Sequence, residues 1–372
     1  MKSHGADSLP NDPHLVAIQF QPVQLKRARE LAGYTKTELA ATIAKTPSAL
    51  SQFESGVIRP DAQTLASLSL ALGVPVSFFA RPSFGDQLDL DACHFRTLRS
   101  TSQHRRRQAV RIGELLDEVL RTVEKFGVSL PAERVSSLRR GVSSPEEIEQ
   151  CAADVRRSWG LGMGPIPRPI TLFESNGVRI LPLSKACEEV DAFSLWRGPD
   201  PVVLLSLAKP ASRVHFDAAH ELGHLVMHDD VQPGSPEAES HADRFASAFL
   251  MPKETFLQEA PSRWSFPVFL ALKKRWRVSI QAAVVRTYQL GHLSLASYRR
   301  AFMYLNHFQL RRQEPDEWIL ERPQVLRRAL ALVEKELPAS ALAAELGLHA
   351  RFLNELLEPV TAMDGNAPQP AS

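Results

Sequence analysis

Two histidines and a glutamate within five residues are suited to metal-dependent hydrolysis. His220, Glu221 and His224 form the pattern His-Glu-x-x-His, with apolar residues on both sides. Positions i and i+4 share one face of a helix, so both imidazoles can reach one ion. Glu221 would lie beside that ion and take a proton from water, whose pKa a bound divalent cation lowers to about 7. The pattern predicts one Zn²⁺ per chain, with Glu221 as the general base.

A second predicted helix offers a third ligand. Glu239 follows His224 by fifteen residues and would complete a His₂Glu set that leaves one coordination position open. Asp243 comes one turn later on the same face, where it can accept the N–H of a ligand histidine. His241 is the rival ligand, but it points about 200° away from Glu239 around the helix. We therefore prefer Glu239. We expect surface or hydrogen-bonded roles for three histidines: His215, His228 and His241.

These segments resemble the ImmA/IrrE family of bacterial zinc metallopeptidases. The resemblance rests on RVHFDAAHELGHLVMH, ESHADRFASAFLMP and the upstream AADVRRSWGLGMGPIPRPITLFESNGVRIL, and it covers about residues 146–258. It implies a minimal zincin, a small twisted sheet packed against the active-site helix. The family's zinc ligands and general base fall on His220, His224, Glu239 and Glu221. Members usually carry Glu-Ala-Asn where this chain has His241-Ala242-Asp243.

Residues near the N-terminus predict DNA binding. Thr35 can cap a helix over residues 36–44, with Glu38 as its capping-box partner, and Thr46 can cap a second helix over residues 47–54. Two capped helices joined by a short turn predict a helix-turn-helix, whose second helix enters the major groove of duplex DNA. The side chains expected at bases and phosphates are Thr35, Lys36, Thr46, Ser48, Ser51 and Gln52. A helical module that docks to protein is the alternative.

This region resembles the Xre family of phage-repressor-like helix-turn-helix domains over about Val23 to Arg81. The resemblance implies a five-helix, lambda-repressor-like domain. Lys36 stands where members usually have glutamine, and residues 46–52 contain no arginine, which points to weak base contacts. In chains where Xre and ImmA/IrrE domains are fused, a segment like FRTLRSTSQHRRRQA joins them, as in this sequence.

Composition restricts where this chain can act. The 372 residues carry a net charge of only +2, so a nucleic-acid surface must be local. The three cysteines have no paired spacing, which argues against a disulfide framework and for a reducing compartment. No apolar run approaches the roughly 20 residues that span a membrane, and the start lacks a secretory signal. We therefore expect a cytoplasmic protein with no membrane partner.

The chain is expected to be multidomain, mainly α with a small α+β part. The expected segments are a disordered tail (1–16), the helix-turn-helix domain (17–82), a linker and basic long helix (83–143), the metallopeptidase domain (144–260), a second helix-turn-helix-like module (261–315), and C-terminal helices with a disordered tail (316–372). The arginine run Arg96–Arg111 could neutralise DNA phosphates or form a solvated helix face. The C-terminal bundle could bind DNA, form a homodimer or hold an inhibitor, and we favour helical packing and dimerisation.

Together these patterns indicate a transcriptional regulator that binds double-stranded DNA and carries a zinc metalloendopeptidase. We expect it to cleave a partner regulator, or itself, after a stress or mobile-element signal. One alternative is a repressor whose metal site is sensory or structural. Another is a toxin–antitoxin-like component that acts by protein binding. Glu221 separates the first two readings, because a hydrolase needs it and a sensor needs only the ligands.

Overall fold

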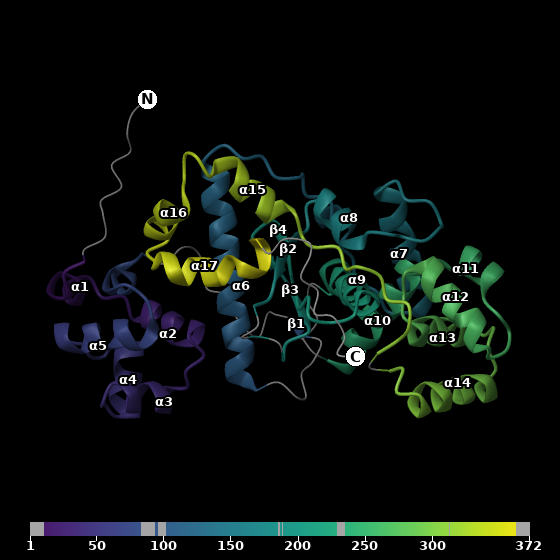
Figure 1. Ribbon diagram of the computed structural model, residues 1–372, viewed down its shortest axis with the longest axis horizontal. Coiled ribbons are helices and arrows are strands. Elements are labelled where there is room, and N and C mark those ends of the chain that lie inside the picture. Colours follow the sequence, from purple (N-terminus) through teal and green to yellow (C-terminus); the bar gives the residue numbers. More distant parts are fainter. Residues whose placement is uncertain are drawn as a thin grey trace.

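The N-terminal domain of the computed structural model is built from short, capped helices. The structure describes residues 11–82, 94–95, 102–184, 187, 189–228, 235–311 and 313–361. The N-terminal helices are α1 (Pro13–Gln19), α2 (Pro22–Leu31), α3 (Lys36–Thr42), α4 (Pro47–Glu54), α5 (Ala62–Leu72) and the 3-10 helix η1 (Val76–Ala80). Figure 1 shows them as a separate purple and blue group at one end of the molecule. The five α-helices agree with the expected lambda-repressor-like domain.

Both predicted caps of the helix-turn-helix are present. The Thr35 hydroxyl accepts from the Glu38 backbone N–H, and the Glu38 carboxylate accepts from the Thr35 N–H at 2.8 Å. Thr46 accepts from the Ala49 N–H at 3.1 Å. Helix α3 ends at Thr42, two residues earlier than expected, and Ala44 adopts a φ of 53° in the turn that follows.

The N-terminus departs from the expected disordered tail of residues 1–16. Helix α1 begins at Pro13, where the Asp12 carboxylate accepts from the His14 N–H at 2.9 Å. Val16 is fully buried, and α1 packs against α5 and η1. The expectation failed for residues 13–16 because it rested on the polar composition of the segment, whereas Val16 and the C-cap residue Phe20 are buried and anchor this short helix. Residues 1–10 lie outside the described residues.

Helix α6 (Gln103–Lys125) is the centre of the molecule and not a connecting helix on its surface. Figure 1 shows it between the N-terminal helices, the sheet and the last three helices. Its apolar side chains join a core that includes residues from all three parts. Arg111, expected at phosphates or in solvent, is buried and bonds Glu30 at 2.7 Å and Glu114 at 2.7 Å. Residues 96–101 of the arginine run lie outside the described residues.

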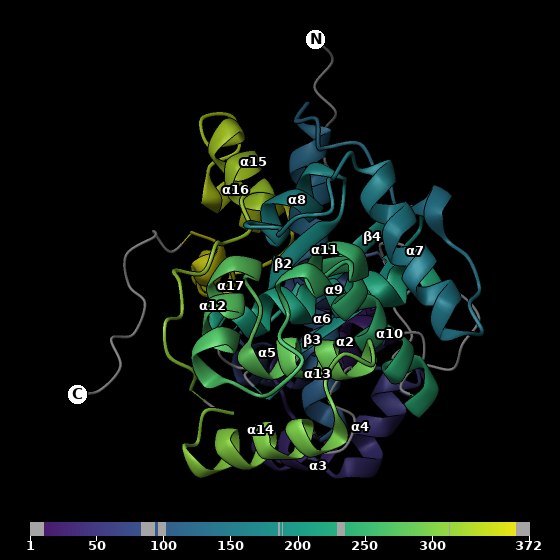
Figure 2. The same cartoon turned by 90° about the vertical axis from the view of Figure 1, so that its right-hand side faces the viewer.

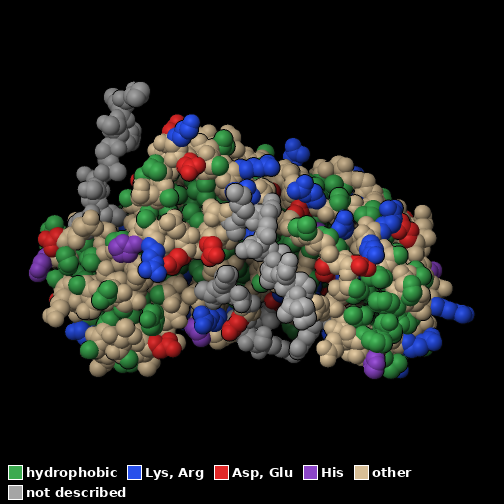
Figure 3. All heavy atoms as spheres, in the orientation of Figure 1, with side chains coloured by type: hydrophobic (Ala, Val, Ile, Leu, Met, Phe, Trp, Pro, Cys, Tyr) green, Lys and Arg blue, Asp and Glu red, His purple; other side chains and the backbone are tan. Residues whose placement is uncertain are grey.

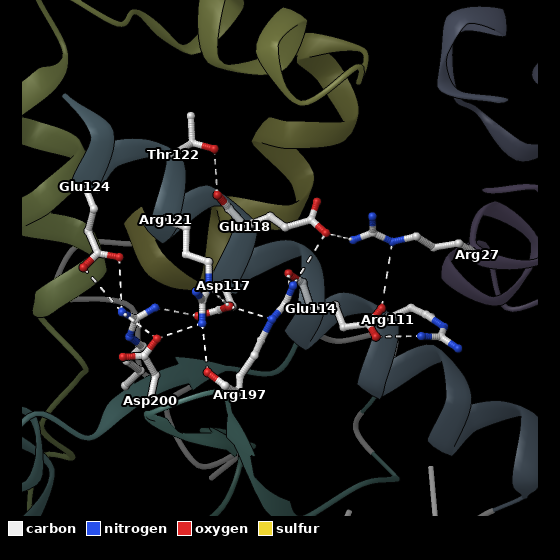
Figure 4. Close-up of polar contacts among 11 residues, drawn as sticks. Arg27, Arg111, Glu114, Asp117, Glu118, Arg121, Thr122, Glu124, Arg197 and Asp200 are labelled. Carbon is white, nitrogen blue, oxygen red and sulfur yellow. Dashed lines mark hydrogen bonds and ion pairs between the residues drawn. The ribbon is translucent and has the colours of Figure 1, made fainter. Parts of the chain in front are cut away.

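Ion pairs continue along α6 from the N-terminal domain to the sheet (Figure 4). Glu118 bonds Arg27 of α2 at 2.6 Å, and Asp117 bonds Arg197 at 3.0 Å. The side chains of Asp117 and Glu118 are only 1% and 8% exposed. Elsewhere, basic and acidic side chains are interspersed on the surface seen in Figure 3. The charges along α6 are buried, and they join two parts of the fold.

A small mixed sheet lies against the other side of α6. Its strands are β1 (His94–Phe95), β2 (Arg179–Pro182), β3 (Ala192–Arg197) and β4 (Asp200–Leu205), in the order β1-β3-β4-β2. β3 is antiparallel to both neighbours, and β2 is parallel to β4. A Cβ on Gly113 would lie 2.5 Å from Leu204, so the glycine allows α6 to approach the sheet closely. Alternate β3 residues face opposite sides: Phe193 and Leu195 join the α6 core, and Ala192 joins the second core.

The second core surrounds α9 (Ala211–Met227), which packs on β3 and β4. Its other helices are α7 (Pro145–Ser158), α8 (Pro169–Ser175), α10 (Pro236–Leu250), α11 (Lys253–Glu259), α12 (Phe266–Trp276), α13 (Ile280–Gln289) and α14 (Leu295–His307), with the 3-10 turn η3 (Ser136–Leu138). Figure 2 shows this group end on, with α9 inside it. No helix among the described residues is both long and apolar enough to cross a bilayer.

The C-terminal helices return to the first core. The chain crosses the molecule after α14 (Figure 1) and forms α15 (Val325–Val333), α16 (Ala339–Glu345) and α17 (Ala350–Thr361). Leu353, Leu356 and Leu357 of α17 are buried in the core that contains α6. This unit uses the apolar face of its last helix for internal packing. Residues 362–372, expected to be a disordered tail, lie outside the described residues.

The buried charges on α6 predict the effect of one substitution. Arg111→Ala leaves the carboxylates of Glu30 and Glu114 buried without this partner, since their side chains are 1% and 5% exposed. Removing one member of a buried pair costs about 3–5 kcal/mol. We expect this loss in the free energy of unfolding measured by urea denaturation. The matched control is Arg351→Ala, in an ion pair whose arginine is 90% exposed. An equal, small effect of both variants would contradict the prediction.

Candidate metal centre

Two neighbouring helices bring three metal-binding side chains together. His220 and His224 lie one turn apart on α9, and their Nε2 atoms are 3.0 Å from each other. Glu239 comes from the first turn of α10, with one oxygen 3.4 Å from His220 Nε2 and the other 3.4 Å from His224 Nε2. A Cβ on Gly223 would lie 3.0 Å from Phe245 of α10. The glycine between the histidines therefore allows α10 to pack closely on α9.

The donor atoms of His220, His224 and Glu239 fit a zinc ion. Tetrahedral zinc with bonds of 2.0–2.2 Å to nitrogen and oxygen needs donor atoms about 3.3 Å apart. The separations of 3.0 and 3.4 Å match that requirement. Two imidazole nitrogens and one carboxylate oxygen also form the donor set of many catalytic zinc sites. The residues present therefore suit zinc, and they are the same three that the sequence nominates.

The Glu239 carboxyl is ionised at neutral pH. Burial acts to raise its pKa, but hydrogen bonds and charge interactions with His220 and His224 outweigh burial and lower the pKa to about 2. A metal ligand must be deprotonated. The carboxylate form is thus available without any further partner.

Two residues outside the metal-binding group orient His220 and His224. Asp243 Oδ1 lies 2.8 Å from Nδ1 of His220, as expected from its position on α10. Nδ1 of His228 lies 2.9 Å from Nδ1 of His224, a contact that the sequence analysis missed. The spacing of four residues between these two histidines was the available signal. Such contacts fix the ring orientation of metal ligands.

A hydrogen bond from the sheet restrains Glu221. It is fully buried, and the Ser194 hydroxyl of β3 donates a hydrogen bond of 2.7 Å to its Oε2. Trp196, two residues further on the same side of β3, donates to the Leu225 carbonyl of α9 at 3.2 Å. β3 is therefore aligned along the metal-binding helix. Ser194 was missed by sequence reasoning, although a lone hydroxyl in the apolar strand AFSLW was a usable signal.

The other two histidines lie outside the cluster. His241 stacks on His228 with ring centres 5.9 Å apart, and the metal-binding group of described residues contains Glu239 instead. His215 of α9 is buried against Trp318, with ring centres 5.5 Å apart. Burial lowers the pKa of His215 to about 4, so it is neutral at physiological pH.

The residues expected to contact DNA lie on the two helices of the helix-turn-helix. Ser48 and Gln52 of α4 are exposed, and Ser51 is partly buried. Lys36 at the start of α3 donates to the Ser51 hydroxyl at 3.2 Å and lies 3.5 Å from Glu54. Thr35 and Thr46 use their hydroxyls to cap helices. The surface of α4 therefore carries small polar side chains, and Lys36 lies beside it.

Two family models match the chain. Residues 25–79 match the helix-turn-helix family, and residues 173–288 match a peptidase family described as the IrrE N-terminal-like domain. The chain combines a helix-turn-helix domain with an IrrE N-terminal-like domain. This confirms the recognition of the fusion from sequence. The IrrE N-terminal-like domain contains all three residues of the metal cluster. α6 and the C-terminal helices lie outside both matches. No curated protein matches the chain.

The geometry predicts the effect of removing each rival ligand. Glu239→Ala should weaken zinc retention, because it removes the only acidic donor in the cluster. His241→Ala should retain zinc, because this ring stacks on His228 outside the cluster. Metal content of the dialysed proteins measures the difference. Zinc loss in His241→Ala with normal zinc in Glu239→Ala would reverse the ligand assignment.

Proposed function

We propose that this protein is a transcriptional regulator that hydrolyses a peptide bond in a partner regulator, or in itself, when a stress or mobile-element signal arrives. The observation that carries the proposal is the cluster of His220, His224 and Glu239 with Glu221 buried on the same helix. Zinc fits its donor atoms. A sensor needs only the ligands, whereas the carboxylate of Glu221 beside them supplies the base that hydrolysis requires.

Each side chain has a separate task in this proposal. Bound Zn²⁺ would polarise the peptide carbonyl and favour ionisation of water near neutral pH. His220, His224 and Glu239 hold the ion, while Asp243 orients the first histidine. Glu221 accepts the proton of the attacking water and delivers it to the leaving amine. The hydrogen bond from Ser194 to Oε2 of Glu221 restrains the carboxylate during both transfers.

The helix-turn-helix domain places this chemistry at duplex DNA. α4 offers exposed Ser48 and Gln52 for the major groove. The domain is fixed to α6 by the buried pairs Arg27–Glu118 and Glu30–Arg111. The metal centre would therefore keep a fixed position relative to the DNA-bound domain and act on a protein bound nearby.

Glu221→Gln tests the peptidase. Glutamine is nearly isosteric but cannot accept the proton, and loss of a general base costs about 10²–10⁴ in rate. We expect normal zinc content and DNA binding, with no detectable shortening of a co-expressed partner repressor under the inducing stress. Glu355→Gln, at a side chain 63% exposed on α17, is the matched control and should cleave normally. If both variants deplete the partner repressor equally, the peptidase proposal is wrong and the metal site is sensory or structural.

DNA binding is tested on the full-length protein. Affinity for duplex DNA should fall steeply as salt rises, because neutralised phosphates release counterions. Gln52→Ala should weaken binding to the specific operator by about 5- to 150-fold, the range expected for one base contact of 1–3 kcal/mol. Gln19→Ala, at an exposed glutamine of α1, is the control and should bind normally. Electrophoretic mobility shifts measure both. Salt-independent binding, or none to fragments from beside the gene, favours a protein-docking module.

A further inference from the structure

A cavity of about 500 Å³ lies between helix α8 and the loop that connects it to α7. Small-molecule sites in proteins have volumes of roughly 300–1,000 Å³ and are mostly apolar, with a few polar groups that orient the ligand. The walls of this cavity follow that pattern, since they include five apolar side chains: Leu161, Pro165, Ile166, Pro167 and Leu172. The cavity therefore has the size and lining of a small-molecule site.

A buried arginine lines the same cavity. Arg156, in the last turn of α7, is 2% exposed. Its Nε donates to the Gly162 carbonyl at 3.1 Å, and Nη1 donates to the Phe249 carbonyl at 2.6 Å. Nη2 donates to the carbonyls of Gly162 and Gly164. A guanidinium has five N–H groups, so one N–H of Nη1 has no partner among the described residues.

Arg156 also lacks an opposite charge, as a second buried arginine makes clear. Arg286 of α13 is fully buried and donates to the Met251 carbonyl at 3.0 Å, and its Nη1 and Nη2 pair with Glu149 at 2.5 and 2.8 Å. Among the residues that the structure describes, Arg156 bonds only neutral carbonyls. Burial lowers its pKa to about 10, so it is a cation at neutral pH. A buried charge is costly unless an opposite charge compensates it.

We propose that this cavity binds a small organic carboxylate, which accepts a hydrogen bond from Nη1 of Arg156 and packs its apolar body on the walls. The carboxylate would supply the missing negative charge, and hydrogen bonds between ionised groups are about twice as strong as neutral ones. A second lining arginine, Arg168, is 68% exposed and lies 3.6 Å from Glu321, so it already has an acidic neighbour. Arg156 is therefore the group that selects an anion.

The proposed site is separate from the metal centre and does not depend on the proposed peptidase function. Phe249, which Arg156 contacts, lies at the C-terminal end of α10, whereas Glu239 lies in the first turn of that helix. Ten helical residues span about 15 Å. The cavity and the metal-binding group are thus at opposite ends of α10.

The test titrates zinc-loaded, full-length protein with three probes and follows the backbone amide signals by two-dimensional NMR. Cyclohexanecarboxylate has a charge and an apolar ring, cyclohexanecarboxamide is its neutral analogue, and acetate has the charge alone. We expect cyclohexanecarboxylate to bind with a dissociation constant on the order of 1 mM or below. The other two should bind at least about tenfold more weakly, because one lacks the charge and the other the apolar contact. No binding of cyclohexanecarboxylate, or equal affinity for either of the other probes, overturns the proposal.

Two substitutions test the cavity itself. Arg156→Met removes the charge, and Leu172→Trp fills the cavity while it leaves Arg156 and its hydrogen bonds in place. Each should weaken the binding of cyclohexanecarboxylate at least about tenfold. The matched controls are Arg157→Met, at a side chain 72% exposed on α7, and Leu332→Trp, at a leucine 73% exposed on α15. Both should bind like wild type. Wild-type affinity in Leu172→Trp overturns the proposal even where Arg156→Met fails to fold.

Spectra of the wild-type protein locate the probe without any substitution. The amide signals of Gly162, Gly164 and Thr171, which line the cavity, should shift when cyclohexanecarboxylate is added. Those of His220 and Glu239 should stay in place. Shifts confined to His220 and Glu239 would place the carboxylate on the zinc ion and overturn the proposal.

Discussion

The ion pairs buried along α6 hold the two functional parts of this protein in one arrangement. Asp117 bonds Arg179 and Arg197 from the sheet, while the next residue, Glu118, bonds Arg27 from the helix-turn-helix domain. Taking these charges out of water is costly unless each keeps its partners. Small relative movements of the two parts would break several pairs together. The network therefore favours a single docked arrangement over two freely moving domains.

β3 connects this network to the metal centre. Ser194 restrains Glu221 on one side of the strand, and Arg197, three residues later, pairs with Asp117 of α6. The strand is short and almost wholly buried, so neither end can shift alone. The position of Glu221 thus depends on the same packing that holds the DNA-binding domain. The two domains that match separate families are therefore packed together through buried residues.

The segment between α14 and α15 is held in place by three of its carboxylates, which accept hydrogen bonds near the N-termini of other helices. Glu314 accepts from the Ile280 N–H at the start of α13, Glu317 from Ser212 near the start of α9, and Glu321 from Ile170 of α8. Each satisfies N–H groups that a helix leaves without internal partners, and a negative charge is favourable there. Lys273, fully buried, pairs with Glu314 and Glu317. The metal-binding helix α9 is therefore held at its N-terminus by residues about a hundred positions later in the chain.

The sequence by itself determined the features that depend on near neighbours. The caps at Thr35 and Thr46, the helix carrying His220 and His224, and the choice of Glu239 over His241 all follow from spacings of a few residues on one helix. Spacing along one helix decides which side chains share a face, and that can be read from the sequence without knowing how the helices pack. The family resemblance then supplied the order of the two main domains, which the matches to residues 25–79 and 173–288 confirm.

Only the tertiary structure decided the contacts between distant segments. Arg111 bonds Glu30 across 81 positions, and Ser194 bonds Glu221 across 27. A run of arginines looks the same in sequence whether it faces DNA, solvent or buried carboxylates, and α6 was misjudged for that reason. The apolar stripe of α17 likewise gave no sign of which surface it covers. Pairings of this kind depend on which faces meet when the whole chain packs, because burial is what makes each charge require its particular partner.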